Sequence, residues 1–87
     1  MVIWKFELLI TDMQEVAMPD GAELLSVANE NGNLFLWAMV NPSKVNQHRY
    51  IEIIGTGNPV YVNMGIDRKF IGTVVINQFV WHVFERL

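Results

Sequence analysis

The stretch from Gly55 to Pro59, Gly-Thr-Gly-Asn-Pro, combines residue types that can bind an anion. Its two glycines let backbone N–H groups form a nest, and Thr56 and Asn58 add a hydroxyl and an amide. A P-loop needs wider glycine spacing, then Lys and Ser or Thr, and a following helix, whereas a dinucleotide fingerprint needs a third glycine. The sequence around this stretch has neither the P-loop residues nor the third glycine. The stretch therefore predicts a tight turn at a strand end, with a weak anion site as the alternative.

Used alone, such a loop binds nucleotides poorly. One nest of amides without a lysine supplies roughly 4 kcal/mol, which corresponds to millimolar affinity. We therefore expect no tight nucleotide binding by Gly55, Thr56, Gly57 and Asn58 themselves.

Two other side chains are candidates for ligand or partner binding. His82 stands between Trp81 and Val83 in an apolar run. This setting is typical of a half-buried imidazole bonded to a neighbouring backbone group, and the alternative is a polar anchor in a pocket. Arg49 begins an expected strand and can bring a positive charge to the sheet end that holds the loop, with a plain surface position as the alternative.

No catalytic or metal-binding pattern emerges from the remaining polar residues. Ser26 and Ser43 lack the context of a nucleophile elbow, and the two histidines lack metal-ligand spacing. Glu7, Glu52 and Glu85 fall on the expected polar sides of strands, where a solvated face is the usual explanation. We expect a protein that is not an enzyme and that uses neither a metal nor a cofactor.

The elements that must position these residues are β-strands, because the apolar residues recur mostly with a period of two. In residues 2–10, for example, Trp4, Phe6, Leu8 and Ile10 lie on one face, and Lys5 and Glu7 lie on the other. The segment 60–67 is predicted to be irregular or a brief strand. Strands are predicted over residues 2–10, 13–18, 22–30, 33–40, 49–55, 69–76 and 79–87.

Short turns connect these strands. Asn31-Gly32 between two apolar runs is a strong hairpin signal, because a type I′ turn needs positive φ at both central positions. Pro19-Asp20-Gly21 predicts a second tight turn, and Asn77-Gln78 predicts a C-terminal hairpin. Residues 1–87 should thus form a single all-β domain, a small antiparallel sandwich or barrel of about seven strands.

The expected fourth strand has no polar face. Leu34, Leu36, Ala38 and Val40 form one side, and Phe35, Trp37 and Met39 form the other. An antiparallel strand with one wet side should alternate with polar residues. Either both faces lie inside the domain, or the face of Phe35, Trp37 and Met39 is an interface between subunits.

Composition favours self-association. Of the 87 residues, 52% are hydrophobic and 17% are charged, so a domain of this size has more apolar surface than it can hide. A homodimer or higher homo-oligomer is expected. The net charge of −3, with scattered charges, weighs against nucleic acid as a partner.

The absence of cysteine and the first residues of the sequence indicate the cellular compartment in which we expect the protein. The chain has no cysteine, which excludes disulfides and thiolate metal sites and favours a reducing cytoplasm. The apolar run at the start is short and is interrupted by Lys5 and Glu7, so neither a signal peptide nor a membrane span is expected.

Five motifs follow one another in a specific order: IWKFEL, MPDGAELLSVANENGNLFLWAMVNP, GTGNP, FIGTVV and WHVFE. Over nearly the whole chain they resemble a family of small proteins of unknown function from bacteriophages and prophages. The family loop more often reads Gly-Thr-Gly-His-Pro, and Asn58 departs from that pattern, so no role of an imidazole carries over. The resemblance implies phage origin and a compact β domain, and it brings no activity, cofactor or catalytic residues. Together with the cysteine-free sequence and the expected lack of a signal peptide, it leads us to expect a soluble protein of the host cytoplasm.

Three functions fit these observations. The first is a non-enzymatic phage protein that occupies a host protein by shape and an apolar patch. The second is the sequestration of a small anionic ligand or nucleotide signal, in an anti-defence role, at the Gly-Thr-Gly-Asn loop. The third is a virion or assembly component. The first is favoured because the anion-binding groups of the loop are few.

Overall fold

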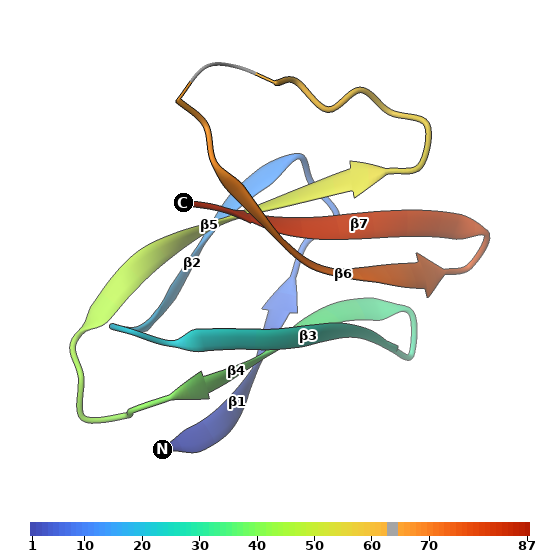
Figure 1. Cartoon of the computed structure of the whole chain (residues 1–87). Helices are drawn as coiled ribbons and strands as arrows, with labels where there is room; N and C mark the ends of the chain where they lie inside the picture. The colour runs from blue at the N-terminus through green and yellow to red at the C-terminus, as the bar shows by residue number, and fades with distance from the viewer. Residues whose placement is uncertain (63–64) are drawn as a thin grey trace.

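The computed structural model describes residues 1–62 and 65–87, and they form an all-β structure. The predicted all-β class, with about seven strands, is confirmed. Every pairing is antiparallel, and the strands form two sheets that pack as a sandwich (Figure 1). None of the described residues forms a helix that could cross a membrane. The strands are β1 (Val2–Leu8), β2 (Met13–Pro19), β3 (Glu23–Glu30), β4 (Asn33–Val40), β5 (Asn46–Gly55), β6 (Arg68–Ile76) and β7 (Phe79–Arg86).

The two sheets meet along one side and separate along the other. The first sheet has the order β1-β4-β3, and the second has the order β2-β5-β7-β6. Edge strands β3 and β6 lie close together, because Asn29 Nδ2 donates to the carbonyl oxygen of Val75 at 3.1 Å. Gly72 lets β6 approach, since a Cβ there would lie 2.9 Å from Cγ2 of Val27. The outer edges of β1, which pairs with β4, and of β2, which pairs with β5, have no strand partner among the described residues.

The predicted turns occur where expected. Asn31 and Gly32 have φ of 54° and 85°, as a type I′ hairpin requires. At the second turn the amide of Ala22 donates to the carbonyl oxygen of Pro19 at 3.2 Å, and Gly21 has φ of 77°. Asn77 has φ of 57° between β6 and β7. Within the segment 60–67, predicted as irregular or a brief strand, residues 63–64 lie outside the described residues.

Alternation along the strands builds the core. Leu34, Leu36, Ala38 and Val40 of β4 are buried between the sheets. Phe35, Trp37 and Met39 lie on the outer face, which the second sheet does not cover, and they are half-buried. The core consists of Leu8, Met18, Ala22, Leu24, Leu34, Leu36, Ala38, Val40, Ile51, Ile53, Val74, Ile76 and Val83.

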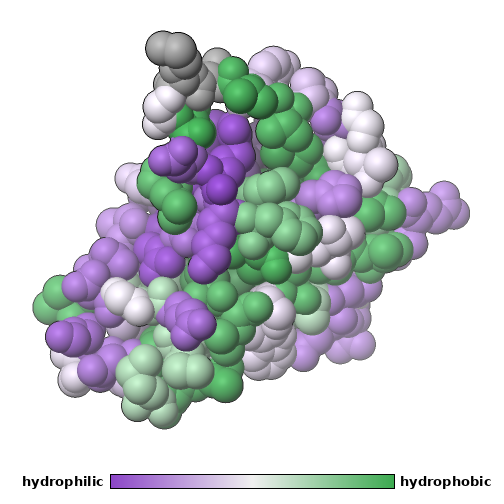
Figure 2. Space-filling model, in the orientation of Figure 1, coloured by the Kyte–Doolittle hydropathy of each residue, from purple (hydrophilic) through white to green (hydrophobic). Residues whose placement is uncertain are grey.

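The side chain of Lys5 covers part of that outer face. Its Nζ lies 4.6 Å from the ring centre of Phe35 and 5.5 Å from that of Trp37, and it pairs with Glu30 at 2.7 Å. Both are cation–π distances. Elsewhere hydrophobic side chains reach the surface in several places, as the face drawn in Figure 2 shows.

Candidate functional site

The Gly-Thr-Gly-Asn stretch is a β-turn at the end of β5, as its first interpretation predicted. The amide of Asn58 donates to the carbonyl oxygen of Gly55 at 3.0 Å, and Gly57 has φ of 89°. The amide of Thr56 donates to the carbonyl oxygen of Val80 at 3.1 Å, which fixes the turn to β7.

His82 is directly connected to this turn. Its Nε2 lies 2.7 Å from Oγ1 of Thr56, and its Nδ1 lies 2.9 Å from Oγ1 of Thr73 on β6. The ring is half-buried, as predicted, but its partners are two side-chain hydroxyls, and the predicted backbone partner was wrong. His82 therefore links the loop to the sheet and leaves no ring nitrogen without a contact.

Arg49 lies elsewhere. It is six residues from Gly55 along β5, about 20 Å at ~3.3 Å per residue, so the prediction that it joins the loop was wrong. Its guanidinium is inside the domain, where Nη2 donates to Glu85 at 3.0 Å and Nη1 donates to the carbonyl oxygen of Ala22 at 2.8 Å. Arg49 thus has a structural role at the opposite end of the strand.

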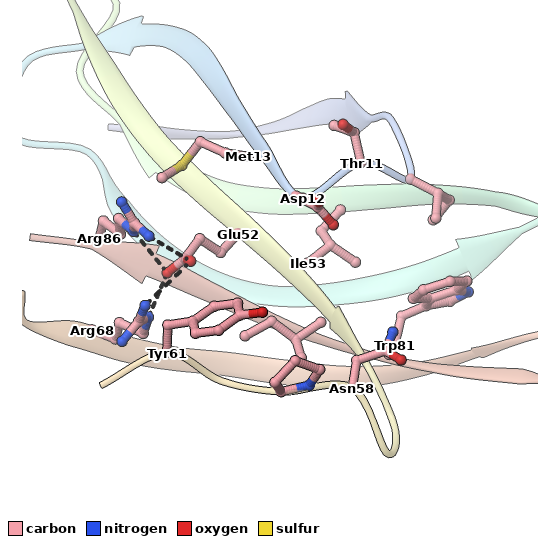
Figure 3. Close-up of a pocket in the computed structure, with 14 residues that line it drawn as sticks. Thr11, Asp12, Met13, Glu52, Ile53, Asn58, Tyr61, Arg68, Trp81 and Arg86 are labelled. Atoms are coloured by element: carbon pink, nitrogen blue, oxygen red, sulfur yellow. Dashed lines mark hydrogen bonds and ion pairs between the residues drawn. The ribbon is translucent and has the colours of Figure 1, made fainter. Parts of the chain in front are cut away.

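A cavity of about 530 Å³ lies beside the turn, over the part of β5 that extends beyond the end of β2 (Figure 3). This volume falls within the range of small-molecule sites. Its walls come from the β1–β2 connection, from β5, from the segment after the turn and from the ends of β6 and β7. The lining residues are Ile10, Thr11, Asp12, Met13, Glu52, Ile53, Ile54, Gly55, Asn58, Pro59, Tyr61, Arg68, Trp81 and Arg86.

One end of the cavity holds two arginines around one glutamate. Arg68 Nε donates to Glu52 Oε1 at 2.6 Å, and Arg86 Nη2 donates to Glu52 Oε2 at 3.1 Å. Arg86 Nε is 3.0 Å from Oε1 as an ion pair, yet it is buried and makes no aligned hydrogen bond. Two guanidiniums carry ten N–H donors, so this carboxylate uses only part of their capacity.

Glu52 remains ionised in this setting. Burial by itself would raise the pKa of its carboxyl group, but hydrogen bonds from Arg68 and Arg86, together with their charges, outweigh burial and lower the pKa below its ordinary value of 4.5. The cluster therefore carries one net positive charge at neutral pH.

The other end of the cavity is aromatic and polar. Trp81 and Asn58 line it, whereas Tyr61 lies nearer to Glu52 and Arg68, and Asp12 lies across from these side chains (Figure 3). The backbone also contributes. Ile53 donates its amide to the carbonyl oxygen of Asp12 at 3.3 Å, toward the edge that β2 has left. Because alternate residues of a strand face the same edge, the N–H of Gly55 points to that edge as well.

The glycine at position 55 is required by close packing. A Cβ there would lie 2.9 Å from Nδ2 of Asn58 and 3.1 Å from Cζ3 of Trp81. The amide end of Asn58 can move at little cost, whereas the indole ring is held by the core. Gly55 thus brings Trp81 and Asn58 together at the cavity wall.

We expect Gly55→Ala to lower the free energy of unfolding by about 1–2 kcal/mol, because the added methyl overpacks the Trp81 ring. The indole N–H resonance of Trp81 should shift in the NMR spectrum. Gly57→Ala is the matched control: no atom lies within 4 Å of its Cβ, and only its φ of 89° strains the variant. An unmoved Trp81 resonance in Gly55→Ala would contradict the packing.

Sequence reasoning missed most of this site. Glu52 and Glu85, predicted to be solvated, are only 7% and 4% exposed, and that prediction was wrong. Glu7 is exposed as predicted. Arg68 and Arg86 were not singled out, although three charged residues within three strands that pair with one another were a usable signal once the strand order was known. No group of three or more His, Asp or Glu side chains suitable for a metal occurs in residues 1–62 and 65–87.

Comparison with known proteins gives one family and no function. No curated protein and no solved structure matches the chain. A family model described as "Domain of unknown function (DUF7352)" matches residues 1–87. The chain, over its full length, belongs to this DUF7352 domain family.

Proposed function

We propose that the protein binds a small nucleotide-like anion in the cavity beside the Gly55–Asn58 turn, and that it acts by sequestering this ligand without chemistry. The observation that carries the proposal is the Arg68–Arg86 pair at one end of a cavity of about 530 Å³ whose other end is aromatic. A mostly apolar concavity with a few convergent polar groups is the common form of a ligand site.

The spacing along β5 suits a ligand with two distinct ends. Glu52, which holds the arginines, and Gly55, which packs on Trp81, are three residues or about 10 Å apart and lie on opposite faces of β5, so the ligand would cross the strand edge that β2 leaves unpaired. A phosphate can accept the remaining guanidinium N–H donors, because planar guanidinium groups match phosphate oxygens. A planar base can then lie against Trp81, and Asp12 can accept from hydroxyl or amino groups between the phosphate and the base.

The turn is one wall of this site. It adds the N–H of Gly55 and the amide of Asn58, while the arginines supply the positive charge that the turn lacks. The turn alone is expected to bind a nucleotide with millimolar affinity. For the complete cavity we therefore expect micromolar affinity. In a phage protein, as the sequence resemblance implies, sequestration of a host signal nucleotide is the corresponding role.

A second candidate is the occupation of a host protein through an apolar surface. The outer face of β4 favours it, because Phe35, Trp37 and Met39 form a half-buried row with no covering element among the described residues. Aromatic residues and Met are enriched in interface cores. Ligand binding is preferred because the cavity combines charge, hydrogen-bond donors and aromatic rings in one place.

Isothermal titration calorimetry tests the proposal. The expected result is micromolar binding of AMP, with weaker binding of adenosine and of inorganic phosphate, because each lacks one end of the ligand. Arg86→Gln should weaken AMP binding at least tenfold, since a hydrogen bond to a charged group contributes about 1.5–3 kcal/mol.

Lys44→Gln provides the matched control. It removes one positive charge from the exposed β4–β5 connection, outside the cavity, and should leave AMP affinity unchanged. If both variants weaken binding equally, the effect is one of general electrostatics. Absence of binding by a panel of mono-, di- and cyclic nucleotides would refute the proposed ligand class.

A further inference from the structure

Strand β1 leaves one complete edge of the first sheet unpaired. It pairs only with β4 among the described residues, and its other edge presents backbone N–H and C=O groups without a strand partner. Such edges readily pair with another chain unless a protein protects them with prolines, bulges or charges that point into the edge.

The edge is apolar and lacks that protection. Val2, Ile3 and Trp4 are 43%, 58% and 41% exposed, although Val2 and Trp4 share the inward face with the buried Leu8. Lys5 does not guard the edge, because its ammonium group turns across the sheet to Glu30 and to the rings on β4.

We propose that two copies of the protein pair antiparallel through β1, with the two-fold axis at Phe6. Opposite residues in an antiparallel pair share a face and contact each other. With the axis at Phe6, Lys5 of one copy lies opposite Glu7 of the other, and Trp4 lies opposite Leu8. The row is complementary to itself in apolar character, and also in charge once the ammonium group of Lys5 turns from Glu30 to Glu7 of the other copy, as a two-fold interface requires.

Neighbouring registers are less favourable. An axis at Lys5 places two lysines opposite each other, and like charges in direct opposition destabilise a sheet. An axis at Trp4 places Lys5 opposite Ile3, with no charge partner. The amide side chain of Gln14 already binds the backbone of Leu9, at 3.0 and 2.8 Å, so the backbone pairing ends at Leu8. Ile3 then lies beside the exposed side chain of Leu9.

This edge interface is distinct from the face predicted from the sequence. Pairing through β1 joins the two first sheets into one sheet of six strands and leaves Phe35, Trp37 and Met39 uncovered. The expected dissociation constant is on the order of 10 μM, since five paired residues form a small interface. The inference is independent of the ligand, because Arg68 and Arg86 are on other strands.

Sizing with light scattering first determines whether a dimer forms, and disulfide cross-linking then determines its register. Because the chain contains no cysteine, introduced thiols report without background. The variants Lys5→Cys and Glu7→Cys, mixed and oxidised, should give a mixed disulfide dimer far more readily than either alone. Glu23→Cys, on the outer face opposite Met39, is the control and should not cross-link.

Three results would overturn the proposal. A monomer at about 100 μM, ten times the expected constant, excludes the dimer. Cross-linking of Glu7→Cys only to itself would establish another register. Efficient cross-linking through Glu23→Cys would place the interface on the face of Phe35, Trp37 and Met39.

The charge pair can also be tested by exchange. Glu7→Lys places the introduced lysine of one copy opposite Lys5 of the other and should weaken the dimer roughly tenfold, and adding Lys5→Glu should restore it.

Discussion

Replacing Arg49 with Ala is expected to destabilise the domain by about 3–5 kcal/mol, because it leaves the carboxylate of Glu85 buried without its cation. The side chains of Arg49 and Glu85 are only 17% and 5% exposed, and Arg49 also donates to the carbonyl oxygen of Ala22. A domain of this size has a total stability of about 5–15 kcal/mol, so the variant should be near its unfolding limit. Urea denaturation followed by circular dichroism measures the change.

Two comparisons identify the cause. Lys44→Ala removes an equivalent charge from an exposed connection and should change stability by less than about 0.5 kcal/mol. The double variant Arg49→Met, Glu85→Leu removes both charges and should recover most of the loss, since a well-packed apolar pair can replace a buried ion pair. A loss below about 1 kcal/mol in Arg49→Ala would mean that water reaches Glu85.

The carboxylate of Glu52 should make stability dependent on pH. Its pKa is lowered in the folded protein, because Arg68 and Arg86 outweigh the effect of burial. A group with a lowered folded pKa contributes fully above its unfolded pKa and loses that contribution as the pH falls through the folded value. Wild type should therefore exceed Glu52→Gln in stability by about 2 kcal/mol at pH 7, from hydrogen bonds to a charged group.

This difference should shrink as the pH falls below the ordinary value of 4.5 toward the lowered folded pKa. Thermal unfolding of both proteins between pH 7 and about pH 2 measures it. Glu23→Gln, at an exposed position of β3, is the control and should follow wild type. A constant difference between wild type and Glu52→Gln over this range would show that the charge of Glu52 is not the source.

Local patterns predicted the strands and the hairpins. The apolar run over residues 33–40 predicted β4, although both of its faces are apolar and the pattern left open which face packs against the second sheet. Asn31-Gly32 identified its turn because a type I′ turn needs positive φ. Both features depend on residues that are close in the sequence.

The candidate site could not be predicted in the same way, because it depends on pairing between strands that are far apart in the sequence. Arg68 and Arg86 meet Glu52 because β6, β7 and β5 are neighbours, and strand order is not encoded in any single strand. Glu52 and Glu85 looked solvated because they are charged, yet both are buried and paired with arginines from other strands: Glu52 with Arg68 and Arg86, and Glu85 with Arg49. The position of His82 beside Thr56 likewise required the pairing of β5 with β7.

An NMR titration with AMP tests the proposed ligand site most directly, because it locates the bound molecule. Amide and side-chain resonances of the protein are followed as AMP is added, with adenosine and phosphate as separate titrants. The expected result is saturable shifts of the Gly55 amide, the Trp81 indole and the Arg68 and Arg86 guanidinium groups at micromolar AMP, and their loss in Arg86→Gln. Shifts confined to exposed groups such as Lys44, or none at all, would contradict binding in the cavity.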